Sequence, residues 1–237
     1  MPGTIPAARQ HLIDDIAKLA RRTRGAPLPL PAFVQAYYRG VGEDDLRARD
    51  SAAFAASAAG TLRFGAVRPA GEPRVRVFNP QLQRDGWESP HTIVEVVTED
   101  MPFLVDSLAV VLSDSRLPIQ LMIHPVLRIA RDRRGKLLSM EEHDSALGTM
   151  ESWQHVAVPR IGDPARHEAL SQNILRMLED VRLAVSDWPA IRQRALDIAR
   201  AVNAGVPAIP RREEKEAVEF IEWLADNHFT FLGYREY

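Results

Sequence analysis

Residues 91–112, HTIVEVVTEDMPFLVDSLAVVL, decide the fold of this chain. The segment 91–98 is rich in β-branched residues and almost continuously apolar, which predicts a strand covered on much of both faces. Asp100 and Pro102 then resemble the start of a helix, since Asp is favoured near the N-cap and Pro in the first turn. Leucines and valines spaced three and four apart predict the helix that follows, which ends before Pro118.

Three further strands are expected after this helix. The run IQLMIHPVLRIA (119–130) predicts a long strand. Pro125 interrupts it, and because proline donates no backbone hydrogen bond, we expect a bulge or an edge position there. The sequence DRRG at 132–135 predicts a hairpin turn into a strand at 136–140. Alternating side chains predict another strand at 151–158.

Helical patterns flank this region on both sides. Residues 1–70 carry apolar residues at helical spacing. Asp163-Pro164 predicts the start of a long helix, and a second helix is expected from near Asp187 to Gly205-Val206-Pro207. The final helix is expected to bury four apolar residues, Ala217, Phe220, Ile221 and Leu224.

The order of elements between 91 and 185 is strand, helix, strand, strand, helix, and RVRVF at 74–78 adds one more strand. This order predicts an α+β fold with a split βαβ arrangement, in which helices cover one face of an antiparallel sheet. Three parts are expected: an N-terminal helical segment at 1–70, the α+β domain at 71–187, and a helical connection at 188–237. Residues 229–237 alternate like a strand without a following partner, so we expect a chain cut at the start of a further domain.

The composition excludes several classes of protein. The 237 residues are 46% hydrophobic and 26% charged, which is typical of globular domains. Cysteine is absent, which excludes disulfides, thiolate zinc sites and thiol nucleophiles. The apolar runs are too short to cross a membrane, and the N-terminus lacks a signal-peptide pattern, so we expect a soluble cytoplasmic protein. A net charge of −2 provides no general attraction for nucleic acid or an anionic membrane.

The sequence contains no pattern typical of a catalytic, cofactor-binding or metal site. Gly40-Val41-Gly42 follows no predicted strand, so it does not form a nucleotide-binding loop. The histidines lack the close spacing of metal ligands, although His124 and His155 are expected on adjacent strands. Glu95 and Asp106 could approach each other where the strand meets the helix, but capping and solvated charge is the favoured interpretation.

A basic hairpin raises the alternative of RNA binding, because RNA-recognition modules share the split βαβ layout. Its cations are Arg128, Arg131, Arg133, Arg134 and Lys136. The strands of this hairpin carry no aromatic residues on which bases would stack. A solvated edge that discourages strand pairing is the better interpretation.

The turn between the first strand and helix of the split βαβ unit is the candidate binding site. It comprises Asp100, Met101, Pro102 and Phe103. Such a turn presents free backbone N–H groups at a helix N-terminus, where a carboxylate could be held. Such a site would suit a small amino acid as the effector, but a well-capped turn without a ligand is the favoured interpretation.

Several well-spaced blocks resemble the amino-terminal part of large bacterial NAD-specific glutamate dehydrogenases. The similarity runs from about residue 74 to 237. The blocks are VRVFNP (75–80), GWESPHT (86–92), DMPFLVDS (100–107), IHPV (123–126), ESWQH (151–155), DWP (187–189) and HFTFLGY (228–234).

This resemblance implies a long, homo-oligomeric, multidomain chain that oxidises L-glutamate to 2-oxoglutarate and ammonia with NAD. It implies that residues 71–187 form an ACT-like domain with a regulatory or assembly role, and that the dehydrogenase domain lies downstream. The partners it implies are the downstream domains and further copies of the chain. The family's glutamate and NAD ligands have no counterpart among these residues, so NAD is expected in the parent enzyme only.

ACT domains that sense amino acids generally carry glycine directly after the proline of the first strand–helix turn. Here that position is Phe103. A phenylalanine side chain would fill the space of the ligand or pack into the core. The sequence therefore favours a non-catalytic regulatory or assembly module, with an amino-acid sensor as the alternative and an independent RNA or protein adaptor as a third hypothesis.

Overall fold

The computed structural model describes residues 7–22, 29–204, 210–231 and 233–235. The chain forms two compact units, Met1–Leu178 and Glu179–Tyr237. Among the described residues, no helix is both long enough and apolar enough to cross a membrane.

The first unit is built on an antiparallel sheet. Its strands are β1 (Arg74–Phe78), β2 (His91–Glu99), β3 (Leu121–Ile123), β4 (Val126–Arg131), β5 (Leu137–Glu141) and β6 (Thr149–Pro159). They are arranged in the order β1-β2-β6-β4-β5, and β3 also pairs with β6. β6 therefore lies between β2 on one side and β3 and β4 on the other. The chain leaves β2 through the following helix and returns as β3 on the far side of β6, which is the predicted split βαβ arrangement. The predicted α+β class and antiparallel sheet are confirmed.

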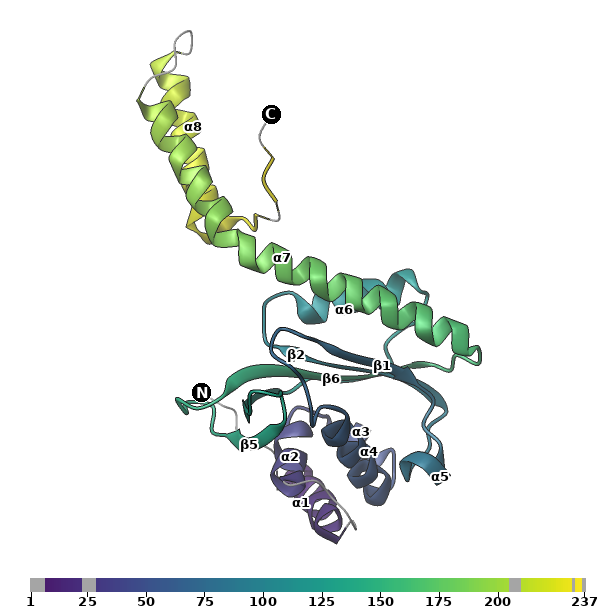
Figure 1. Ribbon diagram of the computed structural model, residues 1–237. Coiled ribbons are helices and arrows are strands. Elements are labelled where there is room, and N and C mark those ends of the chain that lie inside the picture. The colour runs from purple at the N-terminus through teal and green to yellow at the C-terminus, as the bar shows by residue number, and fades with distance from the viewer. Residues whose placement is uncertain (1–6, 23–28, 205–209, 232, 236–237) are drawn as a thin grey trace. The chain divides into compact units, whose positions relative to one another are not determined.

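Helices lie on both faces of this sheet (Figure 1). One face is covered by α6 (Leu104–Asp114) and by the part of α7 (Pro164–Asn203) that belongs to this unit. The other is covered by the N-terminal helices α1 (Ala7–Arg22), α2 (Leu30–Tyr37), α3 (Glu43–Arg47) and α4 (Ser51–Phe64). The helices of the split βαβ unit thus share one face, whereas the N-terminal helices, whose position was not predicted, cover the other. The N-terminal helices share a hydrophobic core with the sheet, which includes Val97, Ile129 and Trp153.

Burial on both faces explains the composition of β2. Seven consecutive residues of this strand, from Thr92 to Thr98, are buried, which confirms the predicted strand covered on both sides. Val97 points toward the N-terminal helices with Trp153, its partner on β6. Trp153 is fully buried and meets the Phe33 ring edge-on, with 5.2 Å between the ring centroids.

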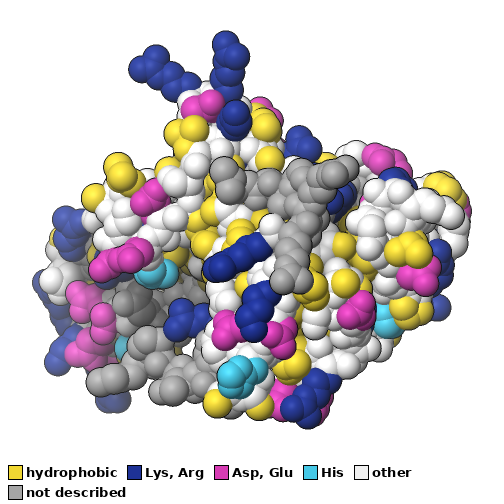
Figure 2. Space-filling view, turned by 90° about the horizontal axis from the view of Figure 1, so that it is seen from below, with side chains coloured by type: hydrophobic (Ala, Val, Ile, Leu, Met, Phe, Trp, Pro, Cys, Tyr) yellow, Lys and Arg dark blue, Asp and Glu magenta, His cyan; other side chains and the backbone are white. Residues whose placement is uncertain are grey.

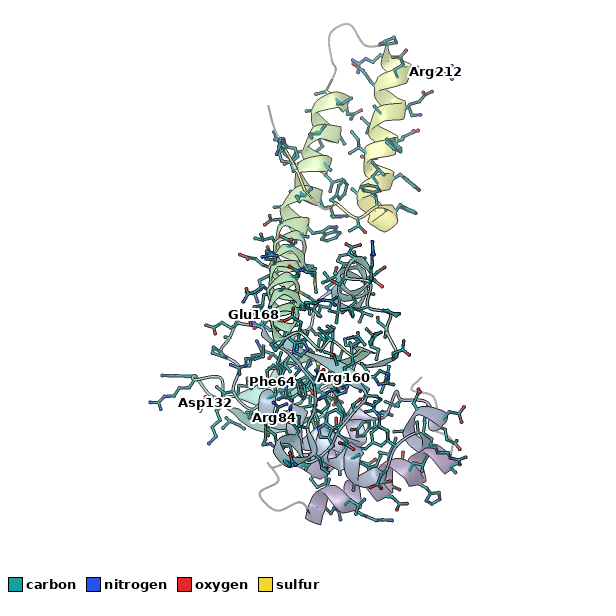
Figure 3. All side chains as sticks on the ribbon, turned by 90° about the vertical axis from the view of Figure 1, so that its right-hand side faces the viewer. Phe64, Arg84, Asp132, Arg160, Glu168 and Arg212 are labelled. Carbon is teal, nitrogen blue, oxygen red and sulfur yellow. The ribbon has the colours of Figure 1, made fainter. Side chains whose placement is uncertain are left out.

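The predicted interruption at Pro125 is confirmed, because it separates β3 from β4. Trp153 N–H donates a hydrogen bond of 3.0 Å to Pro125 O and keeps the two strands in one line along β6. The predicted hairpin turn is confirmed too. Gly135 has a positive φ of 78°, and the Asp132 carboxylate accepts hydrogen bonds from the N–H groups of Arg134 and Lys136. Asp132 is labelled in Figure 3.

The prediction of two successive helices after residue 163 is wrong, because α7 continues through Pro189 to Asn203. A proline inside a helix removes one backbone hydrogen bond, which was the reason to expect a new start. Residues 182–198 contain no glycine, and their other side chains favour helix strongly enough to continue it. The start at Pro164 is confirmed, with Ala165 N–H donating to Asp163 Oδ1. The predicted end at 205–207 lies outside the described residues.

The second unit contains the rest of α7, α8 (Arg211–Trp223) and a π-helical turn, η1 (Leu224–His228). The prediction that α8 buries Ala217 and Phe220 is wrong, since Ala217 is exposed and Phe220 is 58% exposed. Phe220 stacks on Trp223, which stacks on His228. The described part of 229–237 contains no strand.

Replacing Gly65 by alanine should destabilise the first unit by about 1–3 kcal/mol. A Cβ atom at this position would lie 2.2 Å from the ring of Trp153, which is fully buried and cannot move aside. Urea unfolding followed by tryptophan fluorescence measures the change. Gly162→Ala is the control, because a Cβ there meets no atom within 4 Å. Equal stability of the two variants would contradict the close packing of α4 on Trp153.

Candidate functional site

The predicted effector turn connects β2 to α6. Asp100 N–H donates a hydrogen bond of 2.9 Å to Met150 O, which holds the turn against β6. The helix begins at Leu104, and Phe103 occupies the N-cap position without a side-chain cap. The expectation that Asp100 caps the helix is therefore wrong. Asp100 lies too far upstream, because the turn uses three more residues before the helix begins.

Phe103 has the backbone conformation that glycine adopts most easily. Its φ is 71° and its ψ is 0°, in the left-handed region, which is a genuine outlier for a bulky residue. The strain costs on the order of 1–3 kcal/mol. The Phe103 side chain is 42% exposed, so it does not pack into the core. Thus the chain keeps a glycine-like turn and presents an aromatic ring at its surface.

Polar side chains gather on the α6 side of the sheet, next to this turn. His124 Nε2 and Ser152 Oγ share a hydrogen bond of 2.9 Å, and Gln154 Nε2 donates to Ser152 Oγ. Within the described structure, Thr98 Oγ1 and Gln154 Oε1 are buried without a hydrogen-bond partner. Burial lowers the pKa of His124, and the carboxylate of Asp100 opposes this shift.

These polar residues were not predicted as part of the site. The available signal was the pair Ser152 and Gln154, which share one face of β6 with the apolar residues Met150, Val156 and Val158. Buried groups without partners are uncommon in native proteins and need an explanation. The arrangement can supply two hydrogen-bonding groups, Thr98 Oγ1 and Gln154 Oε1, beside a helix N-terminus.

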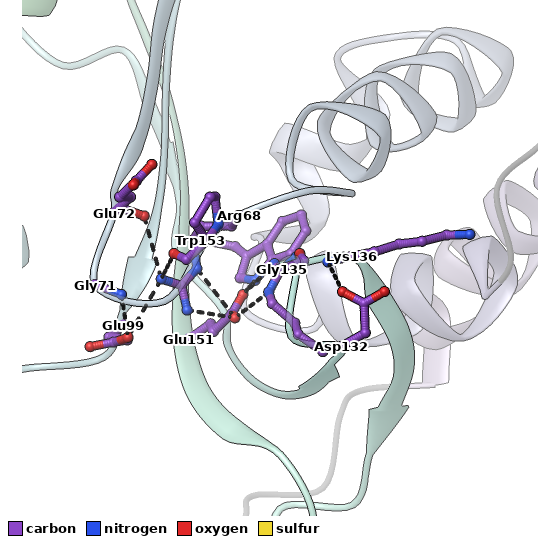
Figure 4. Close-up of polar contacts among 11 residues, drawn as sticks. Arg68, Gly71, Glu72, Glu99, Asp132, Gly135, Lys136, Glu151 and Trp153 are labelled. Atoms are coloured by element: carbon purple, nitrogen blue, oxygen red, sulfur yellow. Dashed lines mark hydrogen bonds and ion pairs between the residues drawn. The ribbon is translucent and has the colours of Figure 1, made fainter.

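A charge centre lies on the opposite face of the sheet, around the fully buried Glu151 (Figure 4). Arg131 donates to both carboxylate oxygens, at 2.7 and 2.8 Å, and Arg68 Nη2 donates to Oε1 at 2.8 Å. Trp153 Nε1 donates to Oε2 at 3.2 Å. Arg68 also lies 3.6 Å from the half-exposed Glu99. The centre therefore joins the segment after α4 to three strands.

Arg131 was expected at a solvated edge, and that expectation is wrong. Its side chain is only 9% exposed, and it forms an ion pair with the buried Glu151. Arg128 is tied to the hairpin instead, donating to the carbonyl oxygens of His143 and Gly148. The other three cations of the hairpin, Arg133, Arg134 and Lys136, are exposed as expected. On the face seen in Figure 2, cationic and anionic side chains are interspersed.

A second buried carboxylate, Glu95, joins α4 and β1 to β6. It accepts hydrogen bonds from Thr61 Oγ1 at 2.7 Å and Arg76 Nε at 2.6 Å, and it pairs with His155 Nδ1 at 3.0 Å. Burial opposes its ionisation, but these hydrogen bonds and the Arg76 charge prevail and lower the pKa of Glu95. Glu95 faces the N-terminal helices, so the possible approach of Glu95 to Asp106 on α6 does not occur.

The two histidines expected on adjacent strands do not converge. His155 contacts Glu95 on one face of the sheet, whereas His124 contacts Ser152 on the other. The residues that the structure describes contain no group of three or more His, Cys, Asp or Glu side chains that could hold a metal ion.

Comparison with protein families gives a match over residues 33–174, more than half of the chain, to a family described as "Glutamate dehydrogenase, ACT1 domain". The chain belongs to this family. The matched ACT1 region includes α6, the sheet and most of α2, so it contains the turn at 100–103 and both buried carboxylates.

Three bacterial relatives of the ACT1 chain are each named NAD-specific glutamate dehydrogenase. The Halomonas elongata protein is 40% identical over 169 residues, and that of Pseudomonas aeruginosa is 35% identical over 168 residues. Each alignment covers 70% of this chain and 10% of the relative. The Mycobacterium tuberculosis protein is 27% identical over 248 residues, covering 97% of this chain and 14% of the relative. The chain thus spans about a tenth of the length of the first two relatives.

Replacing Glu151 by glutamine should destabilise the ACT1 domain by about 3–5 kcal/mol, because it leaves two buried guanidinium groups without their carboxylate. Chemical denaturation of the purified chain measures this loss. The matched control is Glu99→Gln, which removes a half-exposed charge from the same centre and should cost less than about 1 kcal/mol. If both variants lost equal stability, Glu151 would not be the group that holds the centre together.

Proposed function

We propose that this chain is a non-catalytic regulatory and assembly module of an enzyme that oxidises L-glutamate to 2-oxoglutarate and ammonia with NAD. The observation that carries the proposal is the ACT1 family match over residues 33–174. Relatives of about ten times its aligned length, all named NAD-specific glutamate dehydrogenase, support it. In this proposal the dehydrogenase chemistry belongs to downstream domains of the same chain.

The buried carboxylates of the first unit are engaged in structural ion pairs, which supports a non-catalytic role. Glu151 and Glu95 are bound by arginines and other donors of the same unit, so their charges stabilise the packing of helices on the sheet. We place the N-terminal helical segment at 1–70, the ACT-like domain at 71–187 and the connection to the next domain at 188–237. The exposed Phe220 and Trp223 of α8 fit a connection that contacts further domains or a second copy.

The purified chain should form no NADH from glutamate and NAD. In the Pseudomonas aeruginosa relative, deletion of the matched region should change the oligomeric state or the response to effectors while some dehydrogenase activity remains. NADH absorbance and sedimentation velocity measure these properties. NADH formation by the chain alone would overturn the non-catalytic role. An unchanged assembly and unchanged regulation in the deletion variant would overturn the module's proposed purpose.

The buried atoms without partners favour a second function, that of an amino-acid sensor at Asp100, Met101, Pro102 and Phe103. A ligand carboxylate at the N-terminus of α6 would meet free backbone N–H groups. Thr98 Oγ1 and Gln154 Oε1 could then bind its polar atoms. The glycine-like conformation of Phe103, with its side chain largely outside the core, is compatible with this geometry.

If the turn is a sensor, calorimetric titration with glutamate or aspartate should give a saturable signal. Thr98→Val and Asp100→Ala should each weaken binding about tenfold, the change expected for losing one strong hydrogen bond. Asp114→Ala is the control, because it removes an exposed carboxylate from the other end of α6. If no amino acid gave a heat signal with a folded sample, the sensor function would be overturned and only the assembly role would remain.

A further inference from the structure

A groove separate from the β2–α6 turn lies between α2 and the edge of the sheet at β3. Its volume is about 690 Å³, within the usual range for binding pockets of roughly 300–1,000 Å³. The segment Met122–Arg128 forms one wall, and residues 36–41, at the end of α2 and just beyond it, form the other. Met140 and His143 close one end. The groove belongs entirely to the first unit.

The wall formed by β3 has a free backbone edge. Trp153 N–H donates to Pro125 O, so position 125 faces β6, and by the alternation of antiparallel pairs positions 123 and 121 face it as well. The backbone groups of Met122 and His124 therefore point away from β6. The pairing of β4 with β5 begins only at Arg128, and no described strand pairs with β3 on its outer side.

The other edges of the sheet are less open to a new strand. At β5, Leu137 N–H donates to Ala66 O, and Val67 pairs with Lys136, so the segment after α4 covers the start of that edge. At β1, Arg74 and Arg76 place charged side chains along the strand, a common way to discourage pairing. The β3 edge has neither form of protection.

The groove combines an apolar floor with a cationic rim. Ile123, Leu127 and Val41 are buried beneath it, and Met122 and Met140 are partly exposed thioether side chains that adapt to varied partners. Arg39 is exposed at the rim. Arg128 is held there by the carbonyl oxygens of His143 and Gly148. The acid at the rim, Glu141, already accepts a hydrogen bond from Ser139.

We propose that this groove binds an acidic peptide segment of a partner protein in extended conformation, as an added strand on β3. Main-chain hydrogen bonds to Met122 and His124 would supply affinity, as in other cases of strand addition. Alternate side chains of the segment would face the apolar floor, and its carboxylates would meet Arg39 and Arg128. The proposal goes beyond the assembly role, and it holds or fails independently of the sensor at the β2–α6 turn.

The test uses the 237-residue chain and a fluorescent Glu-Val-Glu-Val-Glu peptide, with binding followed by anisotropy. Gly40→Trp should weaken binding at least about tenfold, because a side chain at Gly40 enters open space in the groove. Gly162→Trp is the matched control, since its site is equally open but lies outside the groove. Arg39→Glu should weaken binding similarly, and Arg63→Glu, an exposed arginine outside the groove, should not.

Two further measurements distinguish strand addition from other binding. Amide exchange of Met122 and His124 should slow when the peptide is bound. A fully N-methylated peptide and a Lys-Val-Lys-Val-Lys peptide should bind at least about tenfold more weakly. Equal binding of these peptides, equal binding by the two tryptophan variants, or absence of binding would overturn the proposal. A dimer that forms without peptide and dissociates on Gly40→Trp would also overturn it, in favour of a second copy in the groove.

Discussion

The buried carboxylate of Glu151 is the constraint on which the first unit depends. A charge at this depth is tolerated only with close, well-oriented partners, and here Arg68 and Arg131 provide them. Arg68 follows α4, and Arg131 ends β4, so a single carboxylate fixes the N-terminal helices and the hairpin against β6. Gly135 shows how close this contact is, since a Cβ there would lie 2.3 Å from Arg68 O.

Local patterns were sufficient to predict the strands and their order along the chain. The β-branched run of β2, the interruption at Pro125 and the turn at Asp132–Gly135 each act within a few residues, and all three predictions are confirmed. The position of the N-terminal helices could not be read in the same way. Their apolar stripes show that one side is buried, but which surface covers that side depends on contacts between distant segments, such as Arg68 with Glu151, 83 residues apart.

The candidate site was predictable in place but not in detail. The sequence located the turn at Asp100–Phe103, because the end of a strand and the start of a helix are both visible in it. It did not predict the left-handed conformation of Phe103, since propensity argues against that conformation for a bulky residue. Nor did it predict the cluster of His124, Ser152 and Gln154, because strand register decides which polar side chains meet.

Helices on both faces of the sheet restrict where this domain can bind a ligand or a partner. In many sheet domains an open face binds the partner, but here each face of the first unit packs on helices. Two accessible places among the described residues are the turn before α6, which exposes Phe103, and the free edge of β3 beside Arg39. Both connect directly to the central pair of strands: the turn leaves the end of β2, and the β3 edge rests on β6. A ligand or segment bound at either place would therefore act on the strands that carry Glu95 and Glu151, the two carboxylates that hold the helices in place.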